Sequence, residues 1–293
     1  MKILAFGEVL FDIIHEKKHI GGAPLNFAAH SVKCGARADI LSSVGSDDLG
    51  KKALEEIKRL GVGAAFVQVS DYRPTGTVNV TLKNGSPSYT INKEVAYDYI
   101  DQSELDFENL DGYDAFYFGT LAQREETSRR TLYAILDQVK FPTVFYDVNL
   151  RKDGYSEGML KESLKRCNIV KLNDEEVIVL ASLLYNEDLN EQTFTDLLLE
   201  RFPNIEMIIV TKGPEGCTIY QENTNTDIPS EPVTVKDTVG AGDSFSASFL
   251  VTYLLSGDAR LAAKIGNKVG GYVASQNGAI PEYSDDLKMM NSK

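Results

Sequence analysis

Residues 237–245, DTVGAGDSF, join a glycine-rich turn to the start of a long apolar stretch. That stretch is small and apolar on nearly all sides, which predicts a buried helix over 242–256. The first amide groups of a helix have no acceptor within it, and Gly240, Ala241 and Gly242 have little or no side chain to keep another molecule away. Together with the positive end of the helix dipole, these amides predict a site for an anion.

A carboxylate, that of Asp243, stands directly beside the predicted anion site. A base in this position can take the proton of an alcohol while the amides hold the charge of a phosphoryl group, which is the chemistry of phosphoryl transfer to a hydroxyl. The structural alternative is that Asp243 is an ordinary helix cap and that the glycines only form a turn. An ordinary cap needs one such residue, so the surplus of glycine favours phosphoryl transfer.

Outward from this stretch, short apolar or β-branched runs alternate with longer helical patterns. Because the short runs are apolar on both faces, they predict a mostly parallel sheet that is covered by helices on both sides. The predicted strands are 2–7, 38–45, 114–119, 143–147, 168–173 and 206–213. The predicted helices are 24–35, 47–61, 124–138, 156–166, 174–184, about 193–202, 242–256 and 258–275.

Two segments lack long helical patterns, about 8–20 and 70–100. In the second segment, apolar and polar residues alternate over 75–82 and 88–92 on either side of NGSP, which predicts a half-exposed antiparallel hairpin. We expect both segments to form a small β-sheet lid that is inserted into one domain spanning 1–293. The alternative is a pair of separate surface hairpins.

Composition bounds the function and the location. The net charge of −13 argues against a nucleic-acid surface, which needs a basic excess, although a local field can still hold a small anionic substrate. Three scattered cysteines show no zinc spacing and fit a reducing compartment. No apolar run approaches the roughly 18 residues of a membrane span, and the N-terminus lacks the apolar region of a signal peptide. We therefore expect a cytoplasmic protein.

The stretch DTVGAGDSF resembles the C-terminal signature D-T-x-G-A-G-D of the ribokinase-like (PfkB) carbohydrate kinases. The resemblance implies a ribokinase-like three-layer α/β/α sandwich and ATP-dependent phosphorylation of a sugar. It also implies that Asp243 is the catalytic base and that Gly240, Ala241 and Gly242 supply the anion hole. Asp237 resembles a member of the monovalent-cation site of several relatives, which would make K⁺ a further cofactor.

A second stretch, GGAPLNFAAH at 21–30, places two glycines before a helix start, so a polar ligand can approach the backbone closely. It resembles the N-terminal signature of the same family, which implies that Gly21, Gly22 and Asn26 contact sugar hydroxyls. Asp12, in GEVLFDII, is carried over in the same way as an acceptor for two adjacent hydroxyls. The structural alternative is a plain glycine turn with Asp12 on an exposed strand.

The stretch KLNDEEV at 171–177 places Asn173 and Glu176 three residues apart at a helix start, so both side chains share a face. It resembles the family's N-x-x-E motif, which implies that the pair organises Mg²⁺ and the phosphates, with Glu176 acting through water. The alternative is an acidic first turn that complements the helix dipole.

Three further positions are assigned to the nucleotide by the resemblance. Thr211 and Gly213, in VTKGPEG, end a strand that in the family lies beside the phosphates. A plain turn from a strand into a hairpin explains the glycine equally well. Asn267 falls where relatives approach the adenine.

The stretch YDVNLR at 146–151 presents Asp147, Asn149 and Arg151 at alternate positions after a predicted parallel strand, where ligands bind in open sheets. It resembles the fructokinase and 2-keto-3-deoxygluconate kinase branch of the family. We expect Arg151 to balance the charge of the transferring phosphate.

Together these stretches predict an ATP- and Mg²⁺-dependent kinase that phosphorylates a primary hydroxyl, with D-fructose to fructose 6-phosphate as the first choice. No GxxxxGK[ST] motif is present, which excludes a Walker-type kinase. The alternatives are a kinase for ribose, 2-keto-3-deoxygluconate or a nucleoside, and a sugar- or nucleotide-binding homologue without turnover. The expected partners are a sugar and ATP, with no nucleic acid and no membrane, and the resemblance adds a homodimer formed through the lid.

Overall fold

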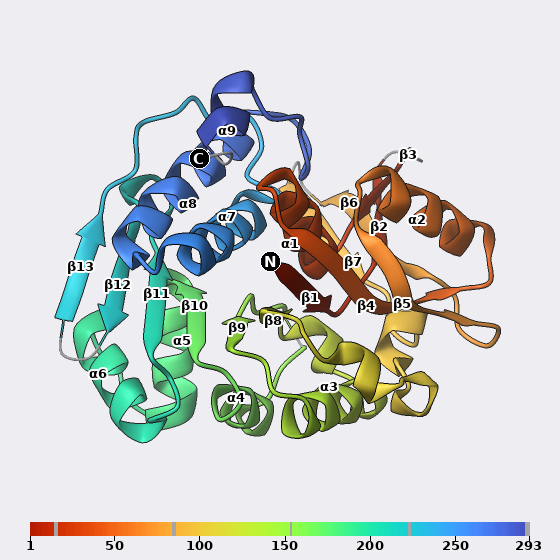
Figure 1. The fold of residues 1–293 in the computed structure, drawn as a ribbon, viewed down its shortest axis with the longest axis horizontal. Coiled ribbons are helices and arrows are strands. Elements are labelled where there is room, and N and C mark those ends of the chain that lie inside the picture. Colours follow the sequence, from red (N-terminus) through yellow and green to blue (C-terminus); the bar gives the residue numbers. More distant parts are fainter. Residues whose placement is uncertain (15–16, 84–85, 153, 222–223, 291–293) are drawn as a thin grey trace.

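The computed structural model describes residues 1–14, 17–83, 86–152, 154–221 and 224–290 (Figure 1). Within these residues the chain forms one large and one small β-sheet together with the helices that cover them. No helix in the described part of the chain combines the length and the apolar character that crossing a membrane requires.

The large sheet contains nine strands in the order β13-β12-β11-β10-β9-β8-β1-β4-β5. From β5 to β11 all neighbouring strands are parallel, and β12 and β13 add an antiparallel edge. The strands are β1 (Lys2–Phe6), β4 (Arg37–Gly45), β5 (Gly63–Ser70), β8 (Ala115–Phe118), β9 (Thr143–Asp147), β10 (Ile169–Asn173), β11 (Met207–Thr211), β12 (Cys217–Gln221) and β13 (Thr224–Ile228). The predicted mostly parallel sheet is confirmed.

Helices cover both faces of this sheet (Figure 1). Successive residues of β1 enter opposite cores: Ile3 packs in the first core, and Leu4 packs in the second. The first core includes α1 (Ala23–Lys33), α2 (Asp48–Arg59), α7 (Ala241–Ser256), α8 (Ala259–Ala274) and α9 (Asp285–Met290). The second includes α3 (Glu126–Gln138), α4 (Glu157–Leu164), α5 (Asp174–Tyr185) and α6 (Glu191–Arg201). The three-layer α/β/α sandwich is therefore confirmed.

The strand order reverses at β1. From β1 the chain builds to β4 and β5 on one side, and it then crosses to build β8, β9, β10 and β11 on the other. In open parallel sheets, ligands bind in the crevice outside the carboxyl ends of the strands at such a reversal. The residues that directly follow β1 and β8, which include Glu8 and Thr120, therefore stand at the expected binding position.

The small sheet has the order β3-β2-β6-β7, with β2 at Leu10–Ile14, β3 at Lys17–Gly21, β6 at Gly76–Lys83 and β7 at Ser86–Ile91. Its two hairpins, β2–β3 and β6–β7, are antiparallel, and β2 pairs with β6 in parallel. This pairing joins the two inserted segments into one sheet, which rules out two separate surface hairpins. Residues 15–16 and 84–85 of the predicted lid lie outside the described residues.

A buried ion pair ties the small sheet to the large one. Arg124, which follows β8, donates from Nε to Asp98 Oδ1 at 2.7 Å and from Nη2 to Asp98 Oδ2 at 2.8 Å. The Asp98 side chain is fully buried, and that of Arg124 is nearly so. Arg124 Nη2 also donates to Asn92 O at 2.6 Å, just after β7. This bidentate ion pair, together with the Asn92 contact, fixes the chain where it leaves the small sheet.

Candidate active site

The mouth of α7 has the backbone form that its glycines predict. Gly240 is the N-cap of α7 with φ 81, and a Cβ there would lie 2.4 Å from Ala279 O. Only glycine fits a left-handed backbone that is packed this closely. The amide of Ala241 donates to Thr238 O at 3.2 Å. Among the described residues, the next two amides, those of Gly242 and Asp243, have no protein acceptor, so they rather than the Ala241 amide are the free donors for an anion.

Gly242 is exposed. A Cβ added at Gly242 would meet a single described group within 4 Å, the ammonium Nζ of Lys171 at 3.7 Å. A buried cation therefore lies directly beside the free amides. Two amide donors, a helix N-terminus and a lysine together favour a negatively charged group at this place.

Asp243 stands at the same helix start as the candidate base. Its Oδ2 accepts a hydrogen bond of 2.8 Å from Asn26 Nδ2, and Figure 1 shows the helices that carry the two residues, α7 and α1, side by side. Burial raises the pKa of Asp243 to about 6, against the lowering effect of the Asn26 hydrogen bond and of Lys171 and Arg151. Above that pH the carboxylate is ionised and can accept a proton.

The predicted sugar-binding residues lie at the start of α1 and on β2. The Asp12 carboxylate lies close enough to Gly21 that a Cβ there would be 3.1 Å from its Oδ2. Gly22 is the N-cap of α1 with φ 111, and a Cβ there would be 2.2 Å from Glu8 O. Asn26 Oδ1 is buried and has no partner among the described residues. The structure thus brings Asp12, the glycines, Asn26 and Asp243 to one end of the sheet.

Arg151 is exposed after β9 and forms no ion pair with a described residue. Its charge lowers the pKa of Glu8, of Asp12 and of Asp243 against the raising effect of burial, which places it at the same end of the sheet as the base. A free guanidinium there can balance the charge of a transferring phosphate, as the sequence predicts.

Asp147 takes a different position from Arg151, although the alternating pattern suggests a shared face. It is buried and accepts from Lys171 Nζ at 2.9 and 3.1 Å. Ser246, in the first turns of α7, donates to Asp147 Oδ2 at 2.8 Å. Sequence reasoning missed this pair. Its signal was a lysine within the apolar run of β10, where a charge needs a partner.

The N-x-x-E pair forms a capping box at the start of α5. Asn173 Oδ1 accepts from the Glu176 amide at 2.8 Å, and Glu176 Oε2 accepts from the Asn173 amide at 2.9 Å. Glu176 Oε1 accepts from the Leu150 amide at 2.7 Å. Each carboxylate oxygen thus has one backbone donor, and the described residues hold no group of three metal-ligating side chains. The arrangement suits contact with Mg²⁺ through water, and magnesium binding by this pair stays a prediction.

The other nucleotide positions differ in what surrounds them. Thr211 ends β11 in register with Asn173. Gly213 has φ 52, and nothing lies within 4 Å of a Cβ placed there, so its face is open. Asn267 is buried, and its Nδ2 donates to Ile228 O at 2.9 Å, which holds the end of β13 against α8. Its predicted contact with adenine stays a prediction.

Two side chains behind the anion site hold the loops there. Asp237 accepts from the amides of Val239 at 3.0 Å and Gly278 at 3.1 Å, and its role toward a monovalent cation stays a prediction. His30, to which the sequence assigned no role, is fully buried. Its Nε2 lies 2.9 Å from Ala279 O, the atom that packs against Gly240, and its Nδ1 lies 2.7 Å from Tyr283 Oη.

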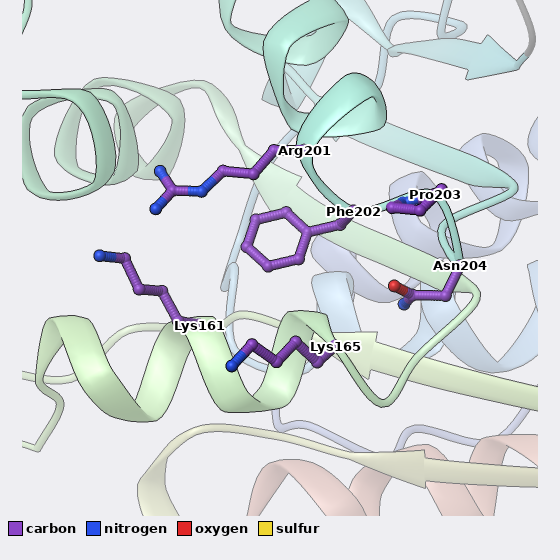
Figure 2. Close-up of a pocket in the computed structure, with 6 residues that line it drawn as sticks. All are labelled: Lys161, Lys165, Arg201, Phe202, Pro203 and Asn204. Atoms are coloured by element: carbon purple, nitrogen blue, oxygen red, sulfur yellow. The ribbon is translucent and has the colours of Figure 1, made fainter.

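A pocket of about 330 Å³ lies elsewhere, between α4 and the end of α6 (Figure 2). The residues that line this pocket come before β10 and β11 in the chain. The pocket therefore lies at the amino ends of these strands, away from the candidate active site. Both of its lysines form ion pairs with glutamates of their own helix. The lining residues are Lys161, Lys165, Arg201, Phe202, Pro203 and Asn204.

Comparison with known proteins finds relatives that match nearly the whole chain. Residues 2–286 match the profile of the pfkB family carbohydrate kinases. A sugar kinase of Pyrococcus horikoshii, itself without an established activity, is 31% identical over 313 aligned positions, which cover 99% of this chain and 96% of that one. The protein named probable fructokinase-5 of Arabidopsis thaliana is 28% identical over 324 positions, with 99% and 98% covered.

Among solved structures, an uncharacterized sugar kinase from Pyrococcus horikoshii in complex with ATP superimposes with a TM-score of 0.80 at 28% identity. The superposition covers 95% of this chain and 94% of that one. The profile match spans nearly the whole chain and includes both glycine-rich stretches. The chain belongs to the pfkB family of carbohydrate kinases.

Proposed function

We propose that this kinase transfers the γ-phosphate of ATP to a primary hydroxyl of a sugar, and that D-fructose is the sugar and fructose 6-phosphate the product. One observation carries the proposal of the reaction. The Asp243 carboxylate, which Asn26 holds by a 2.8 Å hydrogen bond, stands at the same helix start as the unbonded amides of Gly242 and Asp243. A base and an anion hole side by side are what phosphoryl transfer to an alcohol requires.

The proposed reaction assigns a task to each group. Asp243 takes the proton of the sugar hydroxyl as its oxygen forms a bond to the γ-phosphorus, while the bond from that phosphorus to the bridging oxygen of ADP breaks. The free amides of α7 hold the oxygens of the transferring group. Arg151 and the buried Lys171 supply positive charge near Asp243, and both lower its pKa.

Magnesium would meet Glu176 and Asn173 through water, because the Glu176 oxygens already accept backbone hydrogens. When bound, it would neutralise charge on the phosphates. For K⁺ we propose the neighbourhood of Asp237, which lies close behind the anion site.

The small sheet supports a role as a lid. It carries Asp12 on β2, so a movement of this sheet would carry a sugar-binding residue with it. We propose that it closes over the sugar and excludes water, which would otherwise accept the phosphate. We also propose that the small sheet forms a homodimer contact and that the enzyme works in the cytoplasm.

Fructose is the proposed substrate for two reasons. Gly7-Glu8 after the first strand and Ala23-Pro24 after the glycine pair resemble bacterial fructokinases. The profile match is accompanied by a relative named as a fructokinase. Ribose, 2-keto-3-deoxygluconate and a nucleoside are the alternative substrates, and sugar binding without turnover is the alternative function.

A coupled assay of ADP release with a sugar panel tests the proposal. We expect saturable, Mg²⁺-dependent ADP release with the highest kcat/KM for D-fructose, and fructose 6-phosphate as the product by mass and NMR. A higher kcat/KM for another sugar would replace fructose but keep the kinase. If calorimetry shows sugar binding while no sugar stimulates ADP release, the proposed catalytic function is wrong for this chain.

A further inference from the structure

Glu8, which neither glycine-rich stretch contains, lies against the start of α1 in the candidate active site. It follows β1 at the point where the strand order reverses and is 4% exposed. Its Oε1 accepts from the Ala23 amide at 3.2 Å, at the start of α1. Its Oε2 is buried and has no hydrogen-bond partner in the part of the chain that the structure describes.

An unpartnered carboxylate oxygen in this place needs a donor. Leaving a buried acceptor unsatisfied destabilises the folded protein, and more so when the group is charged. The second unpartnered acceptor of this region, Asn26 Oδ1, belongs to the α1 helix whose first turn contacts Glu8. Two buried acceptors that lack donors, from two separate elements, point to a ligand with hydrogen-bond donors.

The electrostatic surroundings of the Glu8 carboxyl include two of the predicted site residues, Arg151 and Asp243. Burial raises its pKa to about 7, the charge of Arg151 opposes the rise, and that of Asp243 adds to it. The Gly22 backbone packs on Glu8, since a Cβ at Gly22 would lie 3.4 Å from Glu8 Cγ and 2.2 Å from its carbonyl oxygen. Glu8 is thus held against the predicted sugar-binding glycines, within the field of the base.

We propose that Glu8 is a further sugar-binding residue, whose Oε2 accepts a hydrogen bond from a substrate hydroxyl and favours neutral sugars over sugar acids. Hydroxyl groups are donors that suit such an acceptor. A ligand carboxylate at this end would meet the acidic groups of Glu8, Asp12 and Asp243. Of the two cations there, Lys171 is already paired with Asp147, which leaves the charge of Arg151 to oppose them. This inference rests on the proposed function and deepens its substrate class.

A competing explanation is a water molecule that satisfies Glu8 without any sugar. Tyr97 Oη is also buried without a described partner, and the Glu8 charge raises the pKa of Tyr97 as a secondary effect after burial. A water between the two groups would satisfy both. If a water binds Glu8 Oε2, the residue only stabilises the fold. If a sugar hydroxyl binds it, the residue contributes to the choice of substrate.

The test is a cycle that combines Glu8→Gln with single deoxy analogues of the preferred sugar. Glutamine keeps the Oε1 that Ala23 needs and replaces the Oε2 acceptor by a donor. We expect the Kd of the parent sugar, measured by calorimetry without ATP at a pH above the Glu8 pKa of about 7, to rise about tenfold or more, as for loss of a hydrogen bond to a charged group. For one deoxy analogue, Glu8→Gln should change the Kd by less than about twofold, because that analogue lacks the hydroxyl that Glu8 binds.

Two further measurements complete the test. Glu8→Gln should lower the preference for the neutral sugar over 2-keto-3-deoxygluconate, measured as the ratio of their Kd values. Tyr97→Phe is the matched control, since it removes the hydroxyl that would bind the other side of a bridging water, and it should leave the deoxy series unchanged. Glu8→Asp, which withdraws the carboxylate by one methylene, should reproduce the loss if Glu8→Gln does not fold.

The inference is overturned if Glu8→Gln weakens every analogue by the same factor, if it leaves the Kd of the parent sugar unchanged, or if Tyr97→Phe reproduces its pattern. These readouts are separate from the proposed function. A protein that binds sugar with the expected deoxy pattern but releases no ADP would contradict the kinase proposal and keep the role of Glu8. A protein that turns over sugar with an unchanged Kd in Glu8→Gln would contradict the role of Glu8 alone.

Discussion

Asn26 Nδ2 donates a 2.8 Å hydrogen bond to Asp243 Oδ2 across 217 positions of sequence. The contact joins the first turn of α1, which follows the predicted sugar-binding glycines, to the first turn of α7, which carries the proposed base. We therefore predict two tasks for Asn26 that its sequence pattern does not separate. Its Oδ1 is free for a sugar hydroxyl, and its Nδ2 holds and stabilises the ionised carboxylate.

Replacing Asn26 by alanine should move the acid limb of the pH profile. The hydrogen bond from Asn26 lowers the pKa of Asp243, which burial raises to about 6, so its loss raises that pKa further. Since the base must be ionised, kcat/KM should begin to fall at a higher pH than in the parent enzyme. Rates between pH 5 and 9 measure this shift. The exposed Asn109→Ala is the control, and an unmoved limb with a uniformly lower kcat/KM would leave Asn26 with sugar binding alone.

Replacing Asp243 by asparagine should remove general-base catalysis and leave the fold intact. Asparagine has nearly the same shape but cannot accept the proton, so kcat should fall by at least about 10²–10⁴-fold. Steady-state kinetics measure the loss, and thermal unfolding checks the fold. Asp48→Asn, at an exposed position on α2, should keep the parent kcat. A kcat of Asp243→Asn within about threefold of the parent would remove Asp243 from its role.

The parallel strands β1, β4, β8, β9, β10 and β11 could be predicted from the sequence because they are largely buried on both faces, which makes their apolar runs conspicuous. The strands β5, β12 and β13 of the same sheet were not predicted, and β5 and β13 are less buried. The gathering of Asp12, Asn26 and Asp243 was implied by the resemblance to the family's two signatures, and helix-start patterns alone do not place these three residues together. The pairing of Lys171 with Asp147 could not be predicted. It depends on β9 and β10 being neighbours in a register that sets these two residues opposite each other, and strand order is not written in periodicity.

Glu176 and Glu8 show the same limit at the level of single side chains. The N-x-x-E pattern is compatible with a magnesium site and with a capping box, and the structure shows the capping box while leaving the metal open. Gly7-Glu8 contributes to the resemblance to bacterial fructokinases, but the sequence carries no signal for the role of the Glu8 side chain, because one glutamate after a strand is common. Only the packing of Gly22 and Ala23 against it reveals that one oxygen is bonded and that the other is free.

Replacing Lys171 by methionine should destabilise the protein strongly, because it leaves the Asp147 carboxylate buried without its cation. Removing one partner of a buried ion pair typically costs about 3–5 kcal/mol. The double variant Lys171→Met with Asp147→Asn should recover much of that free energy of unfolding, since no buried charge is left alone. Urea unfolding measures all three proteins.

The exposed pair Lys51–Asp48 provides the contrast for that experiment. Breaking it by Lys51→Met should change the free energy of unfolding by less than about 1 kcal/mol. If Lys171→Met were no more harmful than this surface change, the buried Asp147 carboxylate would not depend on the charge of Lys171.

Replacing Gly240 by alanine should damage both stability and activity. The new Cβ would stand 2.4 Å from Ala279 O on a left-handed backbone, so the turn before α7 must shift and carry the free amides with it. Gly257→Ala is the matched control: this residue caps the other end of α7 with φ 67, and nothing lies within 4 Å of its Cβ position. We expect Gly240→Ala to lower both the unfolding temperature and kcat more than Gly257→Ala does. Equal effects would show that backbone conformation alone, without the contact to Ala279, decides the outcome.

The neutral, buried His30 should make stability depend on pH below neutrality. Burial lowers its pKa to about 4, and its ring nitrogens contact Ala279 O and Tyr283 Oη. In the unfolded chain His30 binds a proton near pH 6.5, whereas in the folded protein it binds one only near pH 4. The stabilising contribution of neutral His30 is therefore fully present above pH 6.5 and declines as the pH falls toward 4. Between pH 7 and 5 the loss from this residue should be on the order of 2 kcal/mol. Urea unfolding at pH 7 and pH 5 should show a smaller loss in the free energy of unfolding for His30→Gln than for the parent. The control His19→Gln, at an exposed position, should lose as much as the parent. An equal loss in all three proteins would mean that His30 does not cause this pH dependence.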